Sequence, residues 1–84
     1  MNIYVSRKSD STKVSPREVF DAYVEANPKV KDRPLLAMNV IVTMGNTVLA
    51  LSEGDTYTPT DPTEESVVKF ITANYAVTVE DDAI

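Results

Sequence analysis

The chain has 84 residues and carries 8 basic and 13 acidic side chains, which gives a formal net charge of −5. This length supports one small domain. The chain contains no Cys and no His, which excludes a disulfide framework, a metal site ligated by Cys or His, and a Ser–His–Asp catalytic triad. A hydrophobic content of 43% is typical of a folded globular domain rather than of a disordered chain.

The first part of the chain predicts a strand followed by a helix. Apolar and mixed residues alternate over 3–6, which is typical of a short strand. Ser15, Pro16 and Glu18 have the spacing of a capping box with proline at the first helical position. Apolar residues then recur at helical spacing until Asn27-Pro28, where we expect the helix to end.

The central segment 34–52 contains no charged residue and has nearly the length of a membrane-spanning helix. Several polar residues interrupt it, and Gly45-Asn46 near its middle is typical of a two-residue hairpin turn. These features favour two strands, over 36–44 and 47–52, rather than one helix. We therefore expect a β-hairpin here and no association with a membrane.

The last part of the chain predicts a second helix and a final strand. Asp61, Pro62 and Glu64 repeat the capping-box pattern, and apolar residues follow within one helical arc as far as Asn74. A short strand over 76–79 places Val77 and Val79 on one face. Residues 81–84 are expected to form an acidic C-terminal tail.

The resulting order is β-α-β-β-α-β, which predicts an α+β domain of the ferredoxin-like type over residues 1–80. In this arrangement an antiparallel sheet has two helices on one face and leaves the other face open. A three-stranded α+β sandwich is the alternative, because the outer strands are short and the step from helix to strand after Asn74 is tight.

Charge is distributed unevenly along the chain, with a net charge of +2 over 1–42 and −7 over 43–84. An acidic surface can occupy the basic groove of a protein that handles nucleic acid. The first functional hypothesis is therefore a small acidic protein-interaction module, in a narrower version a phage-type inhibitor, that binds a partner with a basic surface. The same acids also serve solubility and helix capping. The residues assigned to this partner-binding surface are Glu53, Asp55, Glu64, Glu65, Glu80, Asp81 and Asp82.

The alternative hypothesis is a structural or assembly subunit that self-associates through the open face of the sheet. A half-apolar exposed face invites a partner, and in this case the partner is a second copy in a homodimer. The residues assigned to that face are Tyr4, Asn39, Ile41 and Val48.

Catalysis and several kinds of ligand are not expected. Asp61 and Glu64 are explained as a helix cap, and Glu65 has the spacing to pair with Lys69, so we predict neither an enzyme nor a metal or cofactor site. The basic residues are few and only Tyr4 supplies an aromatic ring to the open face, so direct nucleic-acid binding is not expected either. The absence of a signal pattern and of Cys predicts a cytoplasmic location.

Overall fold

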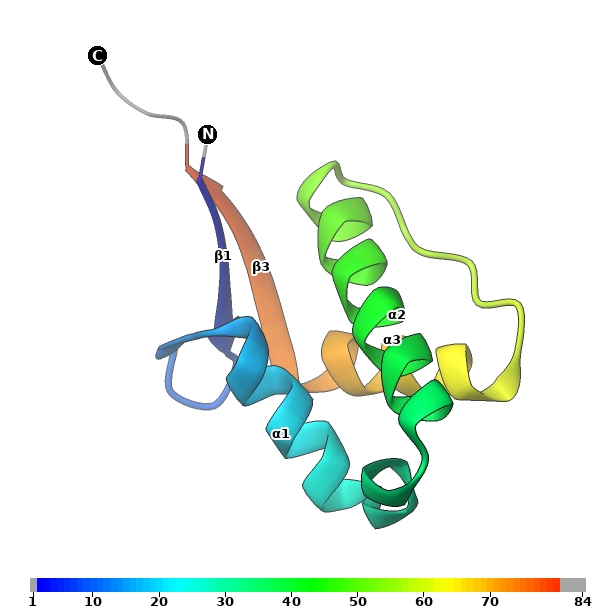
Figure 1. Ribbon diagram of the computed structural model, residues 1–84. Coiled ribbons are helices and arrows are strands. Elements are labelled where there is room, and N and C mark those ends of the chain that lie inside the picture. Colours follow the sequence, from blue (N-terminus) through cyan, green and yellow to red (C-terminus); the bar gives the residue numbers. More distant parts are fainter. Residues whose placement is uncertain (1, 81–84) are drawn as a thin grey trace.

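The computed structural model describes residues 2–80 and has an α+β fold with a three-stranded antiparallel sheet and three α-helices (Figure 1). The predicted acidic tail at 81–84 lies outside the described residues. In chain order the elements are β1 (Asn2–Arg7), β2 (Lys13–Val14), α1 (Pro16–Ala26), the short 3-10 helix η1 (Pro28–Asp32), α2 (Pro34–Ser52), α3 (Pro62–Asn74) and β3 (Tyr75–Glu80).

The sheet has the order β2-β1-β3, so β1 lies in the middle and pairs with a strand from the other end of the chain. Asn2 pairs with Glu80 and Val5 pairs with Val77. Because residues paired across an antiparallel ladder lie on the same face, Val5 and Val77 both belong to the face that carries the core. The opposite face includes Tyr4 and its partner Thr78.

In both predicted capping boxes the N-cap residue starts a helix. The Ser15 hydroxyl accepts a hydrogen bond from the backbone N–H of Glu18 at 3.2 Å at the start of α1. The Asp61 carboxylate accepts one from the N–H of Glu64 at 2.8 Å at the start of α3. In each helix a proline follows the cap, where its missing N–H costs nothing.

The core lies where the three helices meet the sheet. Val40 of α2 and Val67 and Ile71 of α3 are fully buried. Tyr23 of α1 packs edge-on against Phe70 with ring centroids 5.4 Å apart, and its hydroxyl donates to Ser66 at 3.0 Å. Helix α2 packs mainly against α3 and also contacts β3, as Figure 1 shows.

The ferredoxin-like prediction is wrong, because the predicted hairpin over 36–52 is a single helix, α2. Val, Ile and Thr are frequent here and favour strands, yet the segment also contains a helical repeat of side chains that pack against the rest of the molecule. Gly45-Asn46 lies within this helix and forms no turn. The three-stranded alternative has the correct number of strands.

Candidate functional site

The outward side of α2 exposes five large apolar side chains along one helix. Their exposed fractions run from 52% to 83%, and the residues are Leu35, Met38, Ile41, Val42 and Leu49. A surface helix of a globular protein normally places polar residues on its outward side. This side of α2 is therefore the largest departure from the usual surface pattern among residues 2–80.

These exposed residues have a regular spacing. Leu35, Met38, Val42, Gly45 and Leu49 follow one another at intervals of three, four, three and four residues. This spacing places them in one line along a helix, and we call this line the α2 stripe. Ile41 lies beside it.

The buried side of α2 is the more polar one. Thr43 and Thr47 are only 1% exposed and lie on the same buried side of the helix as Val40 and Met44. The Thr47 hydroxyl donates to the backbone carbonyl of Thr43 at 2.7 Å, whereas within residues 2–80 the Thr43 hydroxyl has no hydrogen-bond partner. Helix α2 thus buries two hydroxyls and exposes five large apolar side chains, which reverses the usual preference.

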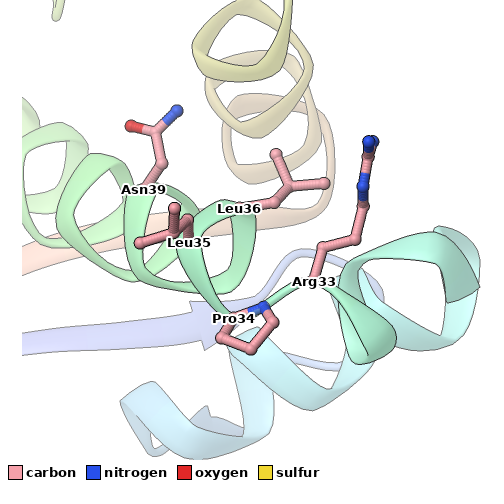
Figure 2. Close-up of a pocket in the computed structure, with 5 residues that line it drawn as sticks. All are labelled: Arg33, Pro34, Leu35, Leu36 and Asn39. Atoms are coloured by element: carbon pink, nitrogen blue, oxygen red, sulfur yellow. The ribbon is translucent and has the colours of Figure 1, made fainter.

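Shallow hollows lie at both ends of the stripe. Figure 2 shows the first, at the start of α2, where Arg33, Leu36 and Asn39 border a depression of about 520 Å³ that Pro34 and Leu35 also line. The second has a volume of about 440 Å³ and lies between the sheet and the later half of α2. Its apolar lining includes Ile3, Val5, Gly45, Val48 and Leu49.

Charges of opposite sign flank α2. Lys29, Lys31 and Arg33 precede the helix, with Asp32 among them, and Glu53 and Asp55 follow it. Of these residues none forms an ion pair with another residue of the described part of the chain. The helix itself contains no charged residue, and the Arg33 side chain makes no capping hydrogen bond.

The residues assigned to an acidic surface lie in several places. Glu53 and Asp55 are exposed directly after α2, and Glu80 is exposed at the end of β3. These two element ends lie on the same side of the molecule, whereas α3 begins far from them (Figure 1). Glu65, near the start of α3, is exposed and forms an ion pair with Lys69 at 2.9 Å. Asp81 and Asp82 lie outside the described residues.

Glu64 was predicted only as part of a helix cap, and the structure gives it a further role in the connector before α3. Its carboxylate is buried and accepts hydrogen bonds from the Thr60 hydroxyl and the Thr60 N–H, both at 2.7 Å, and from the Tyr57 hydroxyl at 3.0 Å. The bond from the Thr60 hydroxyl is the main reason that the pKa of Glu64 is lowered. The hydrogen bond that the Tyr57 hydroxyl donates to Glu64 raises the pKa of Tyr57. This cluster fixes the connector between α2 and α3.

The residues assigned to an open sheet face do not share one. Tyr4 is on the uncovered side of β1, where the Lys13 ammonium lies 3.7 Å from the centre of its ring. Asn39, Ile41 and Val48 belong to α2. Tyr4 and Val48 both line the second hollow, between the sheet and the later half of α2. Asn39 lines the first hollow, at the start of α2.

The stripe was missed because the hairpin interpretation assigned alternate residues to opposite faces. The signal was the spacing of the apolar residues by three and four in an uncharged segment. By length and composition α2 is also able to cross a membrane. It has 19 residues, and its apolar 18-residue stretch has a mean hydropathy of 1.7 and is 22% buried.

Comparisons with known proteins add no further assignment. No family model, no curated protein and no solved structure matches this chain. Among residues 2–80 no three carboxylates lie close enough together to hold a metal ion. The exposed side of α2 is thus the candidate functional site.

Proposed function

We propose that this protein is a protein-interaction module that binds its partner through the exposed apolar side of α2 and acts by binding rather than by catalysis. The observation that carries the proposal is the reversed polarity of α2, which exposes Leu35, Met38, Val42 and Leu49 while it buries Thr43. Contiguous apolar surface of this kind marks interaction sites on folded proteins.

The energetics support a binding role. Fully burying one large apolar side chain contributes about 1.5–3 kcal/mol. The five exposed side chains on α2 are each more than half exposed, so a partner that covers them gains hydrophobic free energy at several positions along one helix. The partner also meets unpaired charges at both ends of α2, basic at the start and acidic at the end.

A protein partner is favoured over a lipid one because α2 is part of the core. Val40, Thr43, Met44 and Thr47 are buried against the rest of the chain. A helix that crosses a membrane must leave that core, which would uncover apolar side chains of α3 that are fully buried in the same cluster, such as Val67 and Ile71. Binding of a protein to the outward side of α2 leaves these contacts unchanged.

The test is photo-crosslinking in the cells that produce the protein, with a photoreactive phenylalanine at Val42. The matched control carries it at Thr72, an exposed position on α3. We expect a discrete protein adduct from position 42 and none from position 72, identified by mass spectrometry. Equal adducts from both positions, adducts with lipid, or no adduct from position 42 contradict the proposal.

A second candidate function is the acidic surface that binds a basic partner, with a phage-type inhibitor as its narrower version. The observation in its favour is that Glu53 and Asp55 are exposed and without ion pairs among residues 2–80. In this case Glu53→Gln with Asp55→Asn reduces the salt dependence of partner binding. Binding that is indifferent to salt in the unaltered protein contradicts it.

A further inference from the structure

We infer that the occupant of the α2 stripe is a second copy of this chain, whose own α2 packs against it in antiparallel orientation around a two-fold axis. This inference rests on the proposed function and names its partner. Three observations carry it, namely the spacing of the stripe, the charges at the ends of α2, and the glycine at its centre.

The spacing is that of a helix–helix seam. Alternating steps of three and four residues are the repeat by which two helices keep one line of side chains in mutual contact. The stripe runs from Leu35 to Leu49, which corresponds to about 21 Å at 1.5 Å per residue, within a helix of 19 residues. A partner helix of the same length and pattern covers it from end to end, and a second α2 has both.

The charges at the ends of α2 favour an antiparallel partner. The N-terminus of a helix carries partial positive charge and the C-terminus partial negative charge. Arg33 at the first end and Glu53 at the second have the wrong sign for their own helix dipole. Beside an antiparallel copy, Arg33 of each chain lies level with Glu53 of the other, so the signs become favourable.

Gly45 has no explanation within the single chain. Glycine in the middle of a helix costs roughly 1 kcal/mol relative to alanine. A Cβ added at this position meets nothing within 4 Å, so the core does not require its absence. Its place within the stripe is explained if another backbone or a large side chain approaches closely there.

The antiparallel arrangement supplies such a side chain. With the two-fold axis between residues 42 and 45, Val42 of one copy lies over Gly45 of the other. Met38 of one copy then lies level with Leu49 of the other. Each interaction occurs twice because the interface is isologous.

The first experiment measures self-association by sedimentation equilibrium over a range of protein concentrations. We expect a dimer that dissociates on dilution, and a rise of at least about a hundredfold in its dissociation constant for Val42→Glu, because apolar contact is lost on both copies and two like charges meet. Leu35→Glu, at the most exposed residue of the stripe, provides a second variant with less risk to folding. Thr72→Glu on α3 is the control and leaves the dimer unchanged.

The second experiment tests the orientation with single cysteines, which the chain otherwise lacks. In an antiparallel pair, Met38→Cys mixed with Leu49→Cys forms a disulfide-linked heterodimer, and neither variant alone forms a linked homodimer. Linked homodimers of each variant alone indicate parallel helices and overturn the orientation.

The third experiment is a charge exchange. Arg33→Glu alone and Glu53→Arg alone each weaken the dimer about three- to tenfold, although each suits the helix dipole and raises the melting temperature of the single chain. The double variant restores the dimer. Loss of association that the double variant does not restore overturns the assigned pairing.

The two proposals fail in different ways. The protein could stay monomeric in sedimentation and yet form a discrete adduct with another protein from position 42. This result overturns the inference that the partner is a second copy and leaves the proposed interaction module supported. A monomer that forms no protein adduct from position 42 overturns both.

Discussion

Helices α2 and α3 lie against each other, yet only α3 has the cap, the end charges and the polar outer side expected of a helix in a single folded chain. Asp61 caps α3, acidic residues occupy its first turn, and Lys69 pairs with Glu65 on its outer side. Helix α2 begins at an uncapped Arg33, ends at Glu53, and exposes large apolar side chains on its outer side. The outer side of α3 carries the charged residues typical of a surface in contact with solvent, whereas the outer side of α2 does not, and this difference is the basis on which we propose a partner for α2.

The largest expected effect comes from the side of α3 that packs on α2. Ile71 is fully buried, so Ile71→Ala should lower the free energy of unfolding by about 2–5 kcal/mol. Urea denaturation followed by circular dichroism measures it. By contrast, Leu49→Ala on the exposed side of α2 should change the unfolding of the single chain by less than about 1 kcal/mol. Similar losses in both variants would show that the outer side of α2 contributes to stability as much as the buried core does, contrary to the comparison.

The helix caps give the next effect, with opposite signs in the two helices. Asp61→Ala removes the cap of α3 and should cost about 1 kcal/mol. Arg33→Ser introduces a cap at α2, where the backbone already has the extended conformation that a cap residue adopts, and should gain up to about 1 kcal/mol. Thermal unfolding of both variants at low protein concentration measures the pair. A loss of stability in Arg33→Ser would mean that Arg33 stabilises the single chain.

A smaller effect is expected at the centre of the stripe. Gly45→Ala places a methyl group in open space and should raise the free energy of unfolding of the single chain by about 0.5–1 kcal/mol, because alanine is the better helix former. The same change should weaken self-association, since the added methyl group lies under Val42 of the second copy. Unfolding and sedimentation measured on one preparation separate the two effects. An increase in both stability and self-association would contradict a close approach of the second copy at Gly45.

The smallest effect concerns pH and the connector between the two helices. The Thr60 hydroxyl, followed by the Thr60 N–H, lowers the pKa of Glu64 in the folded protein. A lowered pKa in the folded state means that this stabilisation is fully present above the unfolded pKa and is lost as the pH falls through the folded one. Melting temperatures between neutral and strongly acid pH should therefore fall less steeply in Glu64→Gln than in the unaltered protein.

The control for the pH prediction lies in the same connector. Thr60→Ala removes the hydroxyl donor and should shift the acid loss of stability to higher pH. Thr58→Ala removes a hydroxyl that makes no hydrogen bond to Glu64 and should leave the curve unchanged. Identical curves for Thr60→Ala and Thr58→Ala would contradict the role given to Thr60.

The parts of the fold that the sequence predicted depend on local signals. Ser15 and Asp61 cap their own helices, and the alternation of Val77 and Val79 places both on the sheet face that also carries their β1 partners Val5 and Ile3. These features involve residues a few positions apart, so composition and spacing are sufficient to find them. The short β2, with only Lys13 and Val14, was missed because its pairing with β1 is its main signal.

Helix α2 was mispredicted because its local signals conflict. Val40, Val42, Leu49 and Leu51 alternate as in two strands, and the same segment also repeats as a helix. Burial of Val40 against α3 favours the helix, and that contact lies far away in sequence. The candidate site was not predicted because the helix was not, since the residues from Leu35 to Leu49 form one line only when the segment is helical.

The pairing of Asn2 with Glu80 sets an order on folding during synthesis. Strand β1 leaves the ribosome first, but only the two-residue β2 is then available to it, and its full-length neighbour is the last element described. The cost of closing so long a loop must be met before the ladder contributes any stability. Until β3 is released, β1 therefore has only the two-residue β2 to pair with, and the sheet is completed last, after α1, α2 and α3 have been synthesised.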